Sequence, residues 1–120
     1  MTTELVVAPR IQAGWDTICR YDRLLPERGV AALLDGVQIA IFRTHAGDVY
    51  AIGNLDPFSG AAVLSRGIVG DRGGEPTVAS PVYKQAFSLL TGSCLDDTVG
   101  VAVPTYPTRV VDGWVQVERR

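Results

Sequence analysis

Histidine and cysteine are scarce in this chain, which has one histidine, His45, and two cysteines, Cys19 and Cys94. Structural zinc sites take four cysteine or histidine ligands, and iron–sulfur clusters are held by several cysteines. The chain therefore lacks the side chains for a zinc or iron–sulfur site of the usual kind. In a reducing compartment we expect the cysteines to be buried thiols. A disulfide stays open as an alternative, because the sequence does not give the Cα separation.

Long hydrophobic runs and an excess of positive charge are also missing. The formal net charge is -2 and the pI is about 5.2, so no basic stripe indicates nucleic-acid binding. No apolar run approaches the roughly 20 residues that span a bilayer, and the N-terminus lacks the basic start and apolar core of a secretory signal. We therefore expect a cytoplasmic protein with no nucleic-acid or membrane partner.

Glycine and proline are abundant, with 13 and 7 residues, and they separate many short apolar runs. The pairs Asp35-Gly36 and Asp112-Gly113 each join two such runs, which predicts β-hairpins with type I′ turns. The run 37–42 is apolar on both faces, which predicts a central, covered strand. Further strands are predicted at 15–19, 30–34, 49–52, 77–79, 86–90, 99–103, 108–111 and 114–117.

This pattern of many short strands predicts an all-β sandwich or small barrel. At 120 residues the chain is expected to form a single domain, residues 14–120, preceded by a flexible arm over 1–13. The segment 71–76 is predicted to be a surface loop.

Two proline-centred loops, 54–60 and 80–84, each follow a predicted strand. They resemble the two cluster-binding loops of the Rieske [2Fe–2S] family, which carry the patterns Cys-x-His and Cys-x-x-His. The four ligand positions are here filled by Asp56, Phe58, Ser80 and Tyr83. A carboxylate, a phenyl, a hydroxyl and a phenol do not replace two thiolates and two imidazoles on iron. The resemblance therefore implies a Rieske-like fold with degenerate loops that have lost their ligands.

Within this superfamily the chain resembles the small subunit of the assimilatory NAD(P)H-dependent nitrite reductase. The shared text includes 15–19 near the start, 37–43, 51–58, 63–67 and 78–81. The resemblance implies a non-catalytic subunit of a cytoplasmic enzyme that reduces nitrite to ammonia in nitrate assimilation. Its partner would be a large subunit carrying FAD, an iron–sulfur cluster and siroheme.

By analogy, the loop tips of such a subunit are expected to dock on the partner. The docking candidates are Asp56, Pro57, Phe58, Ser59, Pro81, Val82, Tyr83 and Lys84. We expect Asp56 to bind backbone amides two residues on and pin its turn. Phe58 and Tyr83 are expected to pack into the space left by the cluster.

Other interpretations stay open at this point. One is a free-standing [2Fe–2S] electron carrier with unexpected ligands, and another is an interaction module of a different oxidoreductase. The adjacent Asp96 and Asp97 are expected to lie on a solvated loop rather than form an acid–base pair. Ser80 is not expected to act as a nucleophile, because the single histidine, His45, lies in a separate turn. No catalytic, cofactor-binding or metal-binding residue is therefore predicted in this chain.

Overall fold

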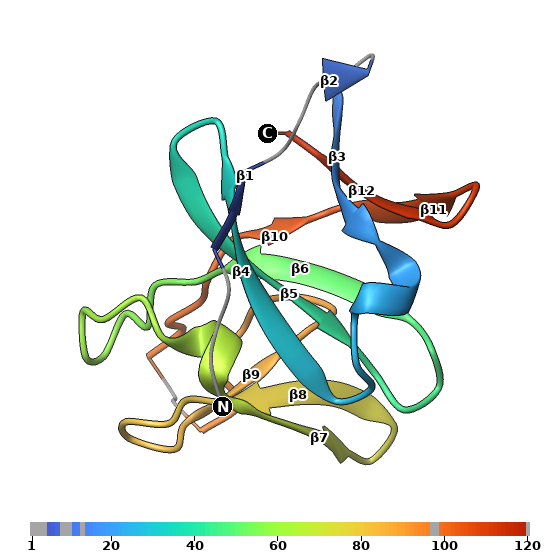
Figure 1. Cartoon of the computed structure of the whole chain (residues 1–120). Coiled ribbons are helices and arrows are strands. Elements are labelled where there is room, and N and C mark those ends of the chain that lie inside the picture. Colours follow the sequence, from blue (N-terminus) through green and yellow to red (C-terminus); the bar gives the residue numbers. More distant parts are fainter. Residues whose placement is uncertain (1–4, 8–10, 13, 97–98, 120) are drawn as a thin grey trace.

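A computed structural model describes residues 5–7, 11–12, 14–96 and 99–119 (Figure 1). Its regular elements are strands and two 3-10 helices, η1 (Tyr21–Arg23) and η2 (Leu64–Arg66). The strands are β1 (Leu5–Val7), β2 (Ile11–Gln12), β3 (Trp15–Arg20), β4 (Arg28–Leu34), β5 (Val37–Arg43), β6 (Val49–Gly53), β7 (Ile68–Arg72), β8 (Glu75–Ala79), β9 (Ala86–Ser88), β10 (Thr105–Tyr106), β11 (Thr108–Val111) and β12 (Trp114–Glu118). The all-β prediction is confirmed. No helix in the described ranges is long and apolar enough to cross a membrane.

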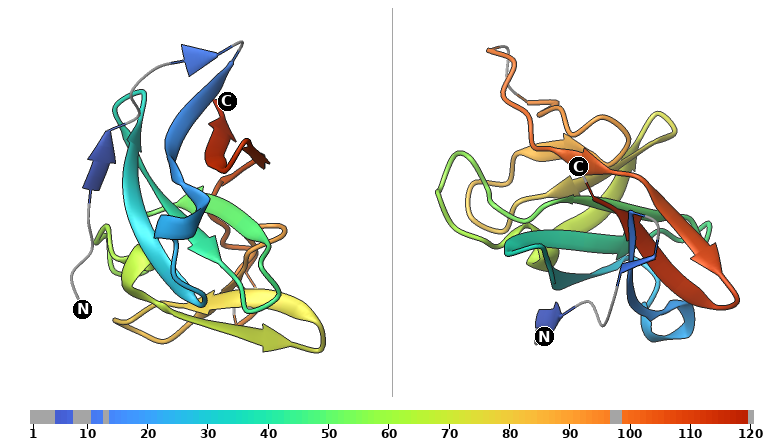
Figure 2. Two further views of the ribbon diagram at one scale, coloured as in Figure 1. Left: turned by 45° about the vertical axis from the view of Figure 1, so that its right-hand side comes forward. Right: turned by 90° about the horizontal axis from the view of Figure 1, so that it is seen from above.

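The strands form three sheets (Figures 1 and 2). A five-stranded sheet has the order β1-β4-β5-β6-β10, a four-stranded sheet has the order β11-β12-β3-β2, and a three-stranded sheet has the order β7-β8-β9. One core cluster joins the five-stranded sheet to β3 and β12, and a second joins it to β8 and β9. The five-stranded sheet is therefore the middle layer.

Strand β5 shows why the sequence folds in these layers, since alternate side chains of a strand point to opposite faces. Ile39 and Ile41 belong to the first core, whereas Ala40 and Phe42 belong to the second. All four side chains are fully buried. The predicted central strand, apolar on both faces, is thereby confirmed.

Both Asp-Gly hairpins are also confirmed. Asp35 and Gly36 have φ values of 53° and 83°, and Asp112 and Gly113 have φ values of 51° and 83°. Type I′ turns require positive φ at both central residues, and Asp and Gly adopt this conformation readily. The turns fix the registers of β4 with β5 and of β11 with β12.

Three predictions about secondary structure need correction. The segment 71–76 is not a loop, because β7 and β8 continue to a two-residue Gly73-Gly74 turn. The strand predicted at 99–103 is reduced to a single bridge between Ala102 and Ser93, and the chain pairs instead after Pro104, in β10. Within the predicted arm 1–13, β1 pairs with β4 and β2 with β3. The other arm residues lie outside the described ones.

Candidate functional site

The first proline loop is closed by hydrogen bonds between its own residues. The amide of Asp56 donates to the carbonyl of Ala61 at 2.8 Å, and the amide of Gly60 donates to the carbonyl of Asp56 at 2.8 Å. The Asp56 carboxylate oxygen Oδ1 accepts a third bond from the Phe58 amide at 2.9 Å. This last contact confirms that Asp56 pins its turn through the amide two residues on.

The second proline loop repeats this pattern. The amide of Ser80 donates to the carbonyl of Gln85 at 2.9 Å, and the amide of Lys84 donates to the carbonyl of Ser80 at 3.0 Å. The Ser80 hydroxyl accepts a bond from the Val82 amide at 3.2 Å. The two loops therefore share one backbone geometry, with Asp56 and Ser80 in the same first position.

A third loop, 88–93, has the same geometry, which we did not predict from the sequence. Ser88 bonds Ser93 and Gly92 through its backbone, and its hydroxyl accepts a bond from the Leu90 amide at 3.1 Å. The sequence contained a pattern that could have predicted this loop, because Ser88 and Gly92 have the same spacing as Asp56 and Gly60. This third loop lacks a proline at its second position, so a search for proline-centred turns passes over it.

The first two loops are joined by the side chains of their first residues, Asp56 and Ser80. The Ser80 hydroxyl donates to the Asp56 carboxylate oxygen Oδ2 at 2.6 Å. Both residues have 0% exposure. Two side chains at vacated ligand positions therefore bind each other in the interior.

The environment of Asp56 favours its ionised form. Burial pushes the pKa of this carboxyl upward, but hydrogen bonds from Ser80, from the Phe58 amide and from Ser59 outweigh burial, so the pKa is lowered. Hydrogen bonds to a carboxylate favour the charged form in this way. The inter-loop bond is therefore a charge-assisted one, which is shorter and stronger than a neutral one.

The two aromatic residues at vacated positions behave differently from each other. Phe58 is half-buried against the second core, with its ring centroid 6.1 Å from that of Phe87. Tyr83 is 59% exposed, so the expectation that it packs inward is wrong. Tyr83 follows the exposed Val82 in the second loop, and its ring lies at the surface.

These side chains do not fit a [2Fe–2S] cluster. Phe58 has no atom that could bind iron, and the Asp56 carboxylate and the Ser80 hydroxyl are hydrogen-bonded to each other. Within the described residues, no group of three or more histidine, cysteine or acidic side chains is arranged to hold a metal ion. Sulfide-bridged iron also prefers thiolate ligands to hard oxygen ligands.

The exposed residues of the two proline loops are mostly apolar. Leu55, Val82 and Tyr83 are 55%, 44% and 59% exposed, and Pro57 and Lys84 are exposed beside them. We call these five residues the tip surface. Leu55 was not among the predicted docking residues. Asp56 was among those residues, but its side chain is buried.

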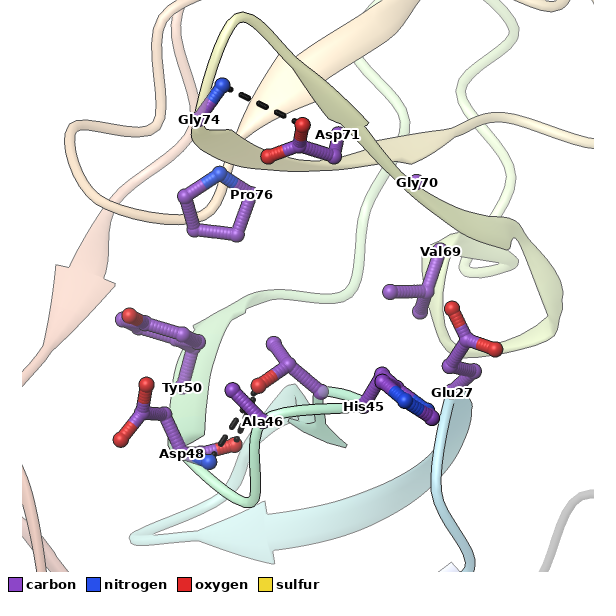
Figure 3. A pocket seen from close by; sticks show the side chains of 11 residues that line it. Glu27, His45, Ala46, Asp48, Tyr50, Val69, Gly70, Asp71, Gly74 and Pro76 are labelled. Carbon is purple, nitrogen blue, oxygen red and sulfur yellow. Dashed lines mark hydrogen bonds between the residues drawn. The ribbon is translucent and has the colours of Figure 1, made fainter.

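A cavity of about 350 Å³ contains His45 and lies between the β5–β6 turn and the β7–β8 hairpin (Figure 3). His45 lies beside Glu27 there, and Tyr50 faces Pro76 across the opening. These two hairpin turns are on the opposite side of the fold from the two proline loops (Figure 1). The Ser80 hydroxyl binds Asp56 and does not line this cavity, so the arrangement gives no support to a serine nucleophile.

The remaining candidates have structural contacts. Asp96 forms an ion pair with Arg72 at 2.8 Å and accepts a bond from the Ala86 amide, whereas Asp97 lies outside the described residues. Cys19 and Cys94 are both free in the structure, so no disulfide joins them.

Comparison with known proteins places the chain in a family. The model of the Rieske-like [2Fe-2S] domain matches residues 14–118. The nitrite reductase (NADH) small subunit of Escherichia coli (strain K12) is 49% identical over 104 residues, which are 86% of this chain and 95% of that protein. A segment of the nitrite reductase [NAD(P)H] large subunit of Klebsiella oxytoca is 46% identical over 103 residues, which are 86% of this chain but 11% of that protein.

A solved structure agrees with these matches. The crystal structure of a Mycobacterium tuberculosis protein, assigned as an NADH-dependent nitrite reductase small subunit, is 60% identical. It superposes with a TM-score of 0.85 and covers 92% of this chain and 98% of that one. The chain therefore belongs to the nitrite reductase small-subunit family and has its Rieske-like domain.

Proposed function

We propose that this chain is the small subunit of a cytoplasmic NAD(P)H-dependent nitrite reductase that reduces nitrite to ammonia. The observation that carries the proposal is the 49% identity to the Escherichia coli small subunit across nearly the full length of both chains. The location follows from the reductant, because NAD(P)H is a cytoplasmic electron donor.

The match to the Klebsiella oxytoca protein supports pairing with a large subunit. There a domain similar to this chain makes up 11% of a polypeptide named a large subunit. In that protein the domain and the rest of the large subunit are necessarily held together. We propose that the chain described here makes the same association with a large subunit.

The chemistry is assigned to the partner. We propose that FAD, an iron–sulfur cluster and siroheme belong to the large subunit, and that this chain holds no cluster. The support is the donor set at the four vacated positions, which does not suit iron. A free-standing [2Fe–2S] electron carrier would need thiolates and imidazoles at these positions.

The tip surface is proposed as the docking surface. Leu55, Val82 and Tyr83 expose apolar area on two loops that a hydrogen bond joins. Aromatic residues are enriched where protein partners meet, and a buried tyrosine is a common source of binding energy. Lys84 adds one positive charge at the rim of this surface.

The test uses co-expression of this chain with the large subunit of its own enzyme. Tyr83→Ala and Val82→Ala each remove apolar area from the tip surface. Val111→Ala is a matched control, because Val111 is exposed to a similar degree, 40% against 44% for Val82, but lies in β11. The dissociation constant and the nitrite-dependent oxidation of NAD(P)H are measured for each folded variant.

We expect Tyr83→Ala to weaken the complex by about tenfold or more and Val111→Ala to leave it unchanged. Equal affinities for all variants would show that docking uses another surface. Failure of the wild-type chain to bind the large subunit, or to affect nitrite-dependent oxidation of NAD(P)H, would overturn the proposed function itself.

A further inference from the structure

The Asp56 carboxylate divides its two oxygens between the two proline loops. Oδ1 accepts a bond from the Phe58 amide of its own loop, and Oδ2 accepts a bond from the Ser80 hydroxyl of the other loop. The same hydroxyl accepts a bond from the Val82 amide at 3.2 Å. A continuous path of hydrogen bonds therefore runs from the backbone of one loop to the backbone of the other.

This connection also joins two sheets. Asp56 follows β6 of the five-stranded sheet, whereas Ser80 follows β8 of the three-stranded sheet. The third loop offers an internal comparison, because the Ser88 hydroxyl likewise donates to a carboxylate, that of Glu75, at 2.5 Å. Glu75 belongs to β8, which pairs with the strand containing Ser88. The Ser88 contact therefore stays within one sheet.

Burial makes the Asp56–Ser80 contact hard to replace. Both residues have 0% exposure, so water does not reach the carboxylate from the surface. A buried polar atom left without its partner costs more than the bond itself contributes to stability. If the Ser80 hydroxyl is removed, the first loop loses a bond as well, although none of its own residues has changed.

We infer that the Asp56–Ser80 pair is a latch that couples the two loops and holds the tip surface in one shape. The latch lies where the vacated ligand positions of the two loops converge, so two side chains of this chain now connect the loops. Asp56 and Ser80 are positioning residues in this scheme, since neither contacts solvent or a partner. The partner, an apolar patch of the large subunit, rests on the proposed function, whereas the coupling of the loops does not.

The coupling is tested in the isolated full-length chain by amide hydrogen exchange. The variants are Ser80→Ala, which removes the latch, Ser80→Thr, which keeps a hydroxyl, and Ser88→Ala, which removes the equivalent hydroxyl of the third loop. Circular dichroism and thermal unfolding show first that each variant is folded. The decisive readout is the exchange of the Phe58 and Gly60 amides, which lie in the loop that carries no substitution.

We expect Ser80→Ala to speed exchange of these two amides by about tenfold or more, because the first loop loses a charge-assisted bond. Ser80→Thr should restore slow exchange, and Ser88→Ala should leave both amides unchanged. Faster exchange in the 80–85 loop alone would overturn the latch. A double-mutant cycle with Asp56→Asn and Ser80→Ala gives a second measurement, and strictly additive effects on unfolding would also contradict it.

The affinity for the large subunit separates this inference from the docking proposal. If the exchange results hold and Ser80→Ala also weakens binding, the latch shapes the docking surface. If exchange is coupled but affinity is unchanged, the latch stands as a property of the fold, and its proposed role in shaping the docking surface is wrong.

Discussion

Lys84 adopts the left-handed backbone conformation, φ 69°, at the loop position that Gly60 fills with φ 75° in the other proline loop. The third loop has Gly92 at this position, with φ 80°. A residue with a side chain pays about 1 to 2 kcal/mol for this conformation, whereas glycine does not. The chain therefore keeps a lysine where the fold favours glycine, and the lysine lies in the tip surface.

We predict that Lys84→Gly separates stability from binding. The free energy of unfolding should stay within about 1 kcal/mol of wild type or increase, because the relief of strain offsets the greater freedom of glycine in the unfolded chain. The affinity for the large subunit should decrease, because the charge and its stem leave the docking surface. Lys84→Asn is the control, since asparagine tolerates the same φ but has no charge. An unchanged affinity in both variants would show that Lys84 does not contribute to docking.

Acid should weaken the latch. The pKa of Asp56 is lowered in the folded state, so its ionised form stabilises the fold at neutral pH. This contribution is complete above the ordinary aspartate pKa of about 3.9 and is lost as the pH falls through the lower folded-state value. We predict that the free energy of unfolding falls less steeply over this acid range in Asp56→Asn than in wild type, as measured by urea titration.

The pKa of Asp96 is also lowered, by its hydrogen bond with Arg72 and by the Ala86 amide, and gives an effect of the same sign. Asp96→Asn is the comparison variant for the acid experiment, because it shows how far the loss of a different carboxylate with a lowered pKa changes the pH dependence of unfolding. If Asp56→Asn kept the full wild-type pH dependence, the Asp56 carboxylate would not be the group that titrates.

Cys19 should be unreactive in the folded protein. Burial raises the pKa of its thiol to about 11, although the positive charge of Arg23 acts in the opposite direction. At pH 8 roughly one thiol in a thousand is then ionised, and the thiolate is the reactive form. In a Cys94→Ala background, alkylation by iodoacetamide should be at least about a hundredfold slower than in urea, as followed by mass spectrometry. Rapid labelling of the native chain would contradict this environment.

Two glycines at the same loop position should differ in their tolerance of alanine. A Cβ atom at Gly60 would meet nothing within 4 Å, whereas one at Gly92 would lie 2.0 Å from the backbone oxygen of Val103. Both variants carry the strain of positive φ, about 1 to 2 kcal/mol. Gly92→Ala should in addition displace the chain around Val103 and be clearly less stable than Gly60→Ala in urea unfolding. Equal losses would mean that the contact with Val103 relaxes freely.

The sequence predicted the features that depend on local conformation. Asp-Gly turns were located from residue identity, because few residues tolerate the φ values that type I′ turns need. The central strand β5 (Val37–Arg43) was located because the residues on both of its faces are mostly apolar. By contrast, β7 was missed, because most of its side chains are exposed and its sequence, 68–72, contains glycine and charged residues typical of loops.

The candidate site was predicted in part. The loss of cluster ligands was visible from Phe58 and Tyr83, because the donor chemistry of a side chain is a property of the residue alone. The outward position of Tyr83 and the exposure of Leu55 could not be predicted. A short loop sequence does not show which of its side chains will be buried in the folded protein. The burial of Asp56 was missed for the same reason.

Residue identity and pattern alone were enough to locate the hairpin turns, the apolar faces of the central strand and the chemistry that the loops cannot perform. These follow from allowed backbone angles, from the two-residue period of a strand and from the atoms in each side chain. By contrast, the contact between Asp56 and Ser80, which are 24 residues apart, is seen only in the folded chain. Their meeting depends on how the three-stranded sheet packs against the five-stranded one, and that packing is the sum of many weak contacts spread over the second core.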